Sequence, residues 1–301
     1  MGFALAAVLT LPIINGNFAE PGQFPAVVAV RNTQVCTGTL IAPDLVLTAA
    51  RCVHAPSLGL ASQAEVTAQT SVTLDTIDAT GDGGRTIAAS DTVPISSYRV
   101  PGDPDVGLVF LAEAVTDVEP VALNLDPSAS PTGVALTMIG FGASATGMTG
   151  RLLYTAPKAT VSCAAFAVNN ALFLCVDQHL GAGICEGDGG GPALAEVDGA
   201  PRLAAIASYG DDACASFGAL MRVDAIVTRA FLHAHVPELV PDDPQVSPPA
   251  PLVPEDDCNA GGGGGLGAAA LVLAALALRR GRRDPRRGLS SRRDDRRFDS
   301  C

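Results

Sequence analysis

The chain has 301 residues, of which 48% are hydrophobic and 4% aromatic, so it is long enough to bury one sizeable core. Its formal net charge is −12, but residues 279–301 carry ten arginines against four aspartates, which leaves −18 on residues 1–278. So acidic a body excludes nucleic acid as the partner of the folded part.

The eight cysteines fall into two groups, six between positions 36 and 214 and two at Cys258 and Cys301. An even set within one compact region predicts disulfides and an oxidising compartment. No C-x-x-C pair occurs, which argues against a zinc site or thioredoxin-like redox chemistry, and Cys301 has no assignable partner. We expect no metal and no cofactor.

The chain begins with an apolar segment, residues 1–12. We interpret it as a truncated secretory signal peptide, because residues 3–11 have the length and apolar character of a signal's hydrophobic region. The alternative is an ordinary buried strand.

From residue 24 onward the chain is a series of short β-branched or apolar runs separated by turn residues. Predicted strands cover residues 26–30, 35–41, 45–48, 66–70, 72–77, 86–93 and 106–111 in a first set, and 134–139, 151–161, 172–176, 193–197, 203–208 and 219–223 in a second. Residues 120–131 are taken as the connection between the two sets. Many short strands without a long helix predict an all-β barrel or sandwich fold.

A helix is predicted at the end of the β-rich region, over residues 224–235, with Asp224 as its N-cap. Residues 237–257 follow, with seven prolines and six carboxylates. Because proline favours the extended polyproline II conformation, this segment is predicted to be a stalk.

The end of the chain combines Cys258, a run of glycines, an apolar segment and an arginine cluster. Residues 261–278 would span about 27 Å as a helix, marginally enough for a bilayer, and the arginines after it would place the tail in the cytoplasm and the domain outside. Residues 258–283 resemble the C-terminal sorting tails of bacterial surface proteins, notably the myxobacterial type, which implies processing or modification at Cys258. Residues 284–301 are predicted to be a disordered, Arg-rich tail. Reading its arginines as a nucleic-acid patch is disfavoured, because they follow an apolar helix.

Three short motifs carry the strongest functional signal. Residues 185–192 read CEGDGGGP and resemble the GDSGGP nucleophile loop of chymotrypsin/trypsin-like serine peptidases, with Gly189 in place of the serine. Residues 48–52 read TAARC and resemble the family's TAAHC, with Arg51 in place of the catalytic histidine. The DVGL that begins at Asp105 resembles the family's DIAL and retains the aspartate of the triad.

The resemblance covers residues 13–236 and implies two six-stranded antiparallel β-barrels followed by a C-terminal helix. It also implies three disulfides, which pair Cys36 with Cys52, Cys163 with Cys175, and Cys185 with Cys214. Residues 13–16 are similar to the start of the mature family domain, where a new amino terminus at Ile13 would pair with the carboxylate of Asp188.

A peptide-binding cleft is implied by the same resemblance. The backbone N–H groups of Gly187 and Gly189 match the family's oxyanion hole. The segment from Ser208 to Gly210 is similar to one that binds an extended peptide by strand addition, and glycine at position 183 makes the primary specificity pocket neutral. The binding residues assigned in this way are Gly183, Ser208, Tyr209, Gly210 and Gly218.

The two substitutions remove the chemistry of this family. That chemistry needs a hydroxyl nucleophile, an imidazole that takes and returns its proton, and a carboxylate that orients the imidazole. Gly189 offers no nucleophile, and the guanidinium of Arg51, with a pKa above about 12, cannot accept a proton at neutral pH. His54 is not expected to substitute, because a shift along the chain re-aims its side chain.

We predict that Arg51 forms an ion pair with Asp105 in the cleft, since an unpaired buried carboxylate is costly. The alternative is an arginine turned toward solvent, with backbone donors around Asp105.

Three functions remain open. The first is a non-catalytic peptide-binding or protein-binding or scaffolding protein, exported and held at the cell surface or outer membrane by its C-terminal segment, or released outside the cell. The second is an active serine endopeptidase with a non-standard catalytic site. The third is a structural domain without a ligand. The sequence favours the first.

Overall fold

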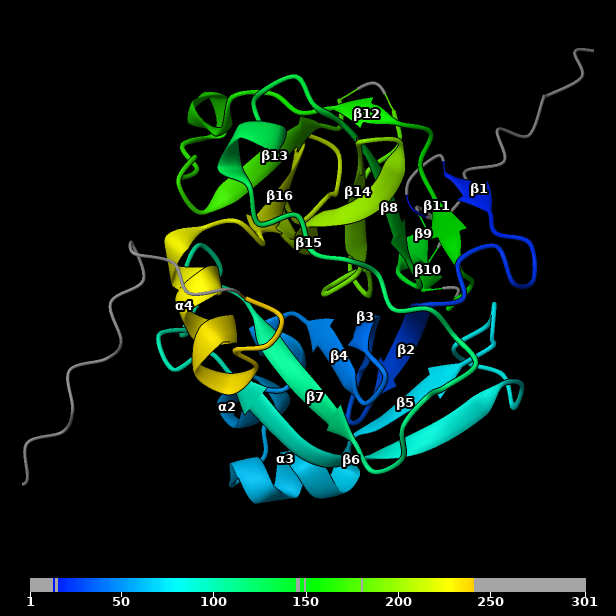
Figure 1. Cartoon of the computed structure of the whole chain (residues 1–301). Helices are drawn as coiled ribbons and strands as arrows, with labels where there is room; N and C mark the ends of the chain where they lie inside the picture. The colour runs from blue at the N-terminus through cyan, green and yellow to red at the C-terminus, as the bar shows by residue number, and fades with distance from the viewer. Residues whose placement is uncertain (1–12, 14–15, 145–146, 149, 180, 241–301) are drawn as a thin grey trace, which may run out of the picture. The chain divides into compact units, whose positions relative to one another are not determined.

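The computed structural model describes residues 13, 16–144, 147–148, 150–179 and 181–240 (Figure 1). These residues form two β-rich halves, in line with the predicted all-β class. The expectations for the segment 1–12 and for everything from residue 241 onward lie outside the described residues. Within the described ranges, no helix is long and apolar enough to cross a membrane.

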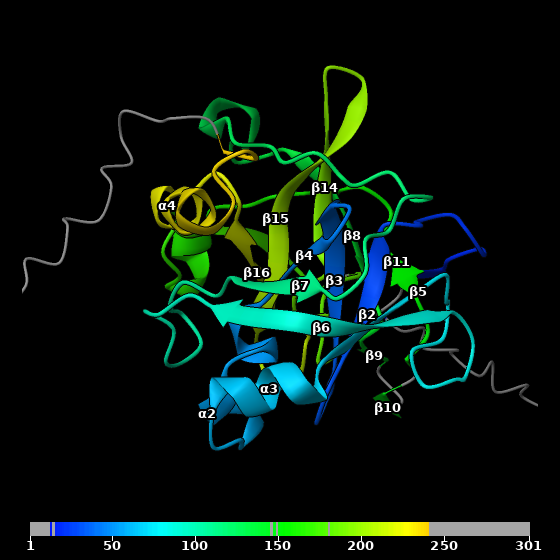
Figure 2. The same ribbon diagram turned by 60° about the horizontal axis from the view of Figure 1, so that its bottom comes forward.

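The first half is a closed six-stranded antiparallel barrel with the strand order β2-β3-β4-β7-β6-β5 (Figure 2). Its strands are β2 (Val27–Arg31), β3 (Val35–Ala42), β4 (Leu45–Thr48), β5 (Ser71–Leu74), β6 (Arg85–Pro94) and β7 (Gly107–Leu111). Five of them were predicted to within a few residues, because their β-branched and apolar runs fit a pleated, buried surface. The sixth, predicted at 72–77, ends earlier in the structure, at Leu74.

The second half is an eight-stranded sheet rather than the closed six-stranded barrel that was expected. Its main path is β1-β11-β8-β14-β15-β16-β13, and β12 also pairs with β8. Among the described residues, the only β-bridge between this part of the chain and β13 joins Val161, which follows β12, to Cys175 of β13. The backbone nitrogen of Val161 lies 2.8 Å from the carbonyl oxygen of Cys175. The ladder there is short because β12 has only 2 residues.

The strands of this half are β1 (Asn17–Phe18), β8 (Ala135–Gly140), β11 (Leu153–Tyr154), β12 (Lys158–Ala159), β13 (Phe173–Asp177), β14 (Pro192–Val197), β15 (Ala200–Gly210) and β16 (Phe217–Arg222); β9 (Ala143–Ser144) and β10 (Gly147–Met148) form a separate hairpin. The single run predicted at 151–161 is thus two short strands. Thr155 lies between them. Its backbone N–H donates a hydrogen bond to the carbonyl of Met138 in β8, and its hydroxyl oxygen accepts one from the backbone N–H of Met138.

One predicted strand, residues 66–70, is wrong. The chain there forms α3 (Gln63–Gln69), which follows the short helix α2 (Ala55–Leu58). Ser62 caps α3 by accepting a hydrogen bond from the backbone N–H of Glu65, and Gln63 anchors the helix to β6 through Thr92. A capping serine followed three residues later by glutamate therefore outweighed the β-branched Val66 and Thr67.

The predicted C-terminal helix is present as α4 (Ile226–His235), but Asp224 is not its N-cap. The N-cap is Ala225, which makes no side-chain capping bond. Asp224 is buried and pairs instead with the guanidinium of Arg222, at 2.8 and 2.6 Å. The packed region continues to Val240, which is 2% exposed and belongs to the core, four residues past the expected boundary at 236.

Strand alternation divides the first barrel's side chains between two cores. Leu45 and Leu47 of β4 face the core between the halves, whereas Val46, between them, faces the inside of the barrel. Because successive side chains point to opposite faces, a single fully buried strand serves both cores. The core between the halves also takes in Ile206, Met221 and Phe231, so the cleft is built on a rigid support.

Candidate functional site

Arg51 is placed by a short 3-10 turn, η1 (Ala50–Cys52), directly after β4. Its neighbours Ala50 and Cys52 are fully buried, and the disulfide from Cys52 to Cys36 ties the turn to β3. The side chain of Arg51 retains 26% exposure, so this turn presents a cation to the cleft.

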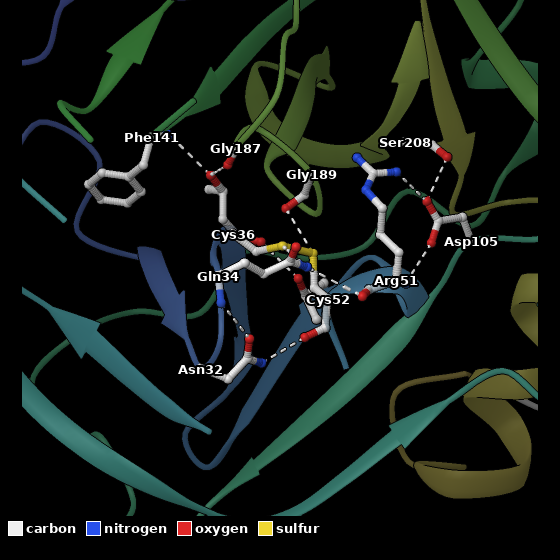
Figure 3. Close-up of a disulfide and its surroundings, with 12 residues drawn as sticks. Asn32, Gln34, Cys36, Arg51, Cys52, Asp105, Phe141, Gly187, Gly189 and Ser208 are labelled. Carbon is white, nitrogen blue, oxygen red and sulfur yellow. Dashed lines mark hydrogen bonds and ion pairs between the residues drawn. A yellow bond between two sulfur atoms is a disulfide. The ribbon is translucent and has the colours of Figure 1, made fainter. Parts of the chain in front are cut away.

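Asp105 lies just before β7, with 1% of its surface exposed. Its carboxylate accepts hydrogen bonds from Nη1 of Arg51 at 2.6 Å, from the backbone N–H of Arg51 at 3.1 Å and from Oγ of Ser208 at 2.7 Å (Figure 3). The predicted ion pair is therefore present. Two further donors satisfy the carboxylate, which is what makes a buried ion pair tolerable.

The guanidinium of Arg51 lies next to Gly189, on the side where a residue-189 side chain would project (Figure 3). A Cβ atom built on Gly189 would come within 2.5 Å of Nη2 and 3.0 Å of Cζ of Arg51. Positions 51 and 189 are thus adjacent in space, and the guanidinium occupies the space into which a side chain at position 189 would project.

The loop that carries Gly189 is held firmly. Its carbonyl groups at Gly187 and Gly189 accept hydrogen bonds from the hydroxyl and the backbone N–H of Thr37, at 3.1 and 2.9 Å. Gly187 has φ +93°, a left-handed conformation that favours glycine. Gly190 approaches Thr48 so closely that a Cβ atom there would lie 2.1 Å from its hydroxyl oxygen. Several glycines in sequence therefore do not make this loop loose.

The resemblance assigned an oxyanion hole to the backbone N–H groups of Gly187 and Gly189. Within the described residues, neither group donates a hydrogen bond, whereas the N–H groups of Asp188, Gly190 and Gly191 all do. Both glycines line the cleft. The loop thus has two backbone donors without a described acceptor, on residues that line the cleft.

Asp188 lies in a tight niche beneath this loop, with 1% of its surface exposed. Its carboxyl group accepts backbone N–H bonds from Gly142 and Cys185, both at 2.8 Å, and burial raises its pKa to about 7. A Cβ atom at Gly140 or Gly142 would lie within 2.4 Å of Asp188, which explains the two glycines around Phe141. No described residue forms an ion pair with Asp188. Ile13 is buried, and the residues that follow it, 14–15, lie outside the description.

A pocket of about 630 Å³ brings the two halves' residues together. Its lining includes Gln34, Cys36, Arg51, Gly187, Gly189, Ser208, Tyr209 and Gly210, with the acidic residues Glu186, Asp211 and Asp212. Of the predicted binding residues, the strand segment from Ser208 to Gly210 borders it. Gly183 and Gly218 do not.

The side chain of Gln178 explains why these two glycines are excluded. Cβ atoms at Gly183 and Gly218 would lie 2.1 and 2.4 Å from its carboxamide, so the side chain is sandwiched between them. The amide nitrogen donates to the carbonyls of Ile184 and Cys214, at 3.1 and 3.0 Å, and its oxygen accepts the N–H of Ile184 at 2.9 Å. Gln178 therefore fills the space expected for a specificity pocket. Nothing in the sequence distinguishes it from an ordinary turn residue.

The remaining predictions concern disulfides, histidine and metal. The structure contains the disulfides 36–52, 163–175 and 185–214. His54 does not line the pocket; its Nδ1 lies 2.9 Å from Oγ of Ser57, and burial is the main cause that lowers its pKa. In the part of the chain that is described, no cluster of His, Cys, Asp or Glu could hold a metal ion.

This arrangement of fold and site is that of a serine-peptidase domain. Residues 13–229, well over half of the chain, match the Trypsin family, and the chain belongs to that family.

Two relatives illustrate the relationship. One is a serine protease, SP24D, from Anopheles gambiae, 30% identical over 193 residues that cover 60% of this chain and 67% of the relative. The other is an ovochymase from Halocynthia roretzi, 29% identical over 203 residues that cover 62% of this chain. The match spans only 13% of the ovochymase, so it reaches a small part of that protein.

Proposed function

We propose that this member of the trypsin family binds an extended peptide, or an exposed segment of another protein, without cleaving it. The observation that carries the proposal is the position of Arg51, paired with Asp105 and packed against Gly189. A permanently charged guanidinium cannot serve as a general base, and glycine supplies no nucleophile. Neither proton transfer nor acyl transfer is available at these positions.

Binding is supported by what the cleft retains. The end of β15, from Ser208 to Gly210, borders the pocket and pairs with β16 but not with β14, whose pairing stops at Ile206. A strand segment left unpaired on one side beside a groove is a common way to hold an extended peptide. The Cys185–Cys214 disulfide braces two opposite parts of the lining. A rigid cleft reduces the entropic cost of binding.

The three disulfides are consistent with secretion, because such bonds persist in oxidising compartments. We further propose that residues 258–283 retain the protein at a bacterial cell surface, with Cys258 as the processed or modified residue. The apolar run at 266–278 followed by arginines supports this assignment.

Two assays test the proposal. A fluorophosphonate probe is expected to leave the protein unlabelled, and labelling at a serine would overturn the non-catalytic assignment. Random peptides displayed on phage with free C-termini are expected to be enriched on the immobilised protein. The variant Asp212→Trp, at the exposed rim of the pocket, is expected to lose that binding, whereas the matched variant Glu119→Trp, outside the lining, keeps it. Equal binding by both variants would place the peptide elsewhere.

A further inference from the structure

The cleft contains at least three hydrogen-bond donors without partners among the described residues. Arg51 uses Nη1 for Asp105, while its Nη2 has no acceptor within the described ranges and would lie 2.5 Å from a Cβ atom built on Gly189. The other two donors are the backbone N–H groups of Gly187 and Gly189. All three belong to residues that line one pocket.

The edge of the Arg51 guanidinium that carries Nη2 can still bind an anion. Asp105 is buried and receives three donors, one of them the hydroxyl of Ser208, so it occupies one edge of Arg51 only. A guanidinium is planar and can hold a carboxylate on each edge. A second anion is therefore accommodated without breaking the first pair.

Three acidic residues also line the pocket, and they limit how an anion can approach. Asp211 already accepts backbone N–H bonds from Ala215, Ser216 and Phe217, which hold its carboxylate in its own turn. Glu186 and Asp212 are exposed, where solvent and salt screen them. Because these acidic residues also repel an approaching anion, a carboxylate needs further contacts to bind here, which the chain of a bound peptide can supply and a free anion cannot.

We propose that the former catalytic centre is a receptor for the C-terminal carboxylate of a peptide. One carboxylate oxygen accepts the N–H groups of Gly187 and Gly189, and the other accepts Nη2 of Arg51. Capture of a chain terminus by backbone N–H groups and a cation is an established recognition mode. The proposal rests on the peptide-binding function proposed above and names its ligand class.

The last residue of that peptide is expected to be small. The space between Gly183 and Gly218 is occupied by the carboxamide of Gln178, whose hydrogen bonds to Ile184 and Cys214 hold it there. A large terminal side chain directed between these walls would have to displace a fully hydrogen-bonded buried amide, which is costly. Glycine, alanine and serine meet no such barrier.

Two synthetic mixtures of random hexapeptides test the proposal. The mixtures share one composition and differ only at the C-terminus, which is a free carboxylate in one and a carboxamide in the other. Peptides retained by the whole protein are separated by size exclusion and quantified by mass spectrometry. The free-acid mixture is expected to be retained about tenfold more, a difference of about 1.4 kcal/mol, with small residues enriched at the last position.

Two variants identify the donor. Arg51→Lys keeps a cation for Asp105 but lacks the second edge, and Gly189→Ala introduces a Cβ atom where Nη2 lies while keeping both backbone N–H groups. Both are expected to remove the preference for the free acid. The control Arg99→Lys, outside the pocket lining, retains it.

The outcomes separate the two proposals. Equal retention of both mixtures would overturn the carboxylate site and leave peptide binding intact. Retention of neither would overturn peptide binding and the carboxylate site together. A free-acid preference that survives Arg51→Lys and Gly189→Ala would also overturn the site, because the carboxylate would then be bound elsewhere. Enrichment of large terminal residues would overturn the role given to Gln178.

Discussion

Two carboxyl groups are buried beside the cleft, one from each half of the molecule, and each is 1% exposed. Asp105, next to the first barrel, is held by a guanidinium, a hydroxyl and a backbone N–H. Asp188, beneath the glycine loop of the second half, is held by two backbone N–H groups and by no cation among the described residues. Burial therefore raises the pKa of Asp188 to about 7.

The two halves of the site therefore hold their buried carboxyl groups in different ways. On the first side, Arg51 supplies a cation for Asp105. On the second side, Gly189 carries no side chain, and two backbone N–H groups hold Asp188. The following variants test this contrast.

The largest effect is expected from the double variant Arg51→His plus Gly189→Ser. If the second side has kept its geometry, an imidazole next to Asp105 can activate the new serine, and fluorophosphonate labelling should rise by about 100-fold or more over the parent. Each single variant should stay unlabelled. A double variant that stays unlabelled would show that the glycine loop does not hold a serine at position 189 in a reactive geometry.

The next effect concerns the stability of the first side. Arg51→Ala would leave Asp105 buried without a cation, and should lower the free energy of unfolding by about 3 kcal/mol. Arg85→Ala, which breaks an exposed pair with Asp117, should cost far less, because solvent and salt screen that pair. Urea unfolding of both variants measures the ratio, and equal losses would contradict a special role for the buried pair.

On the second side, the titration of Asp188 should make the stability of the folded protein depend on pH. The pKa of Asp188 is about 7 in the folded protein, above the ordinary value of 3.8, so the folded state binds the extra proton. The stability contributed by that proton is complete below the unfolded pKa and is lost as the pH rises toward 7. The Tm should fall by about 5 °C between pH 5 and pH 8 relative to Asp188→Asn, which carries no titrating group there. An identical pH profile for the two proteins would mean that Asp188 does not change its protonation state over this range.

The smallest effect is expected at Gln178, which lies on the second side but was not part of any motif. Gln178→Ala should lower the free energy of unfolding by about 1–2 kcal/mol and open a neutral cavity between Gly183 and Gly218. Indole, a flat neutral probe, should raise the Tm of this variant and not that of the parent. Gln63→Ala removes a comparable amide in the first half and should gain no indole binding. If the parent bound indole equally well, the space would not be filled by Gln178.

The sequence was most informative where local pattern and structure coincide. A short, continuous apolar run located β4 to the residue, and the short motifs led to the Arg51–Asp105 pair. It was misleading at 63–69, where Val66 and Thr67 indicated a strand although Ser62 and Glu65 carried a capping signal. The arrangement of Gln178 could not be predicted, because it depends on Gly183 and on Gly218, and Gly218 is far from both residues along the chain and comes next to them only in the fold.

The closeness of position 189 to the guanidinium has a bearing on how this chain can change over generations. A serine introduced alone at 189 would bring its Cβ atom to 2.5 Å from Arg51 and would lack a base, while a histidine introduced alone at 51 would face a residue with nothing to activate. Neither single change supplies both a nucleophile and a general base, so a mutational path to hydrolysis at this cleft requires both changes together.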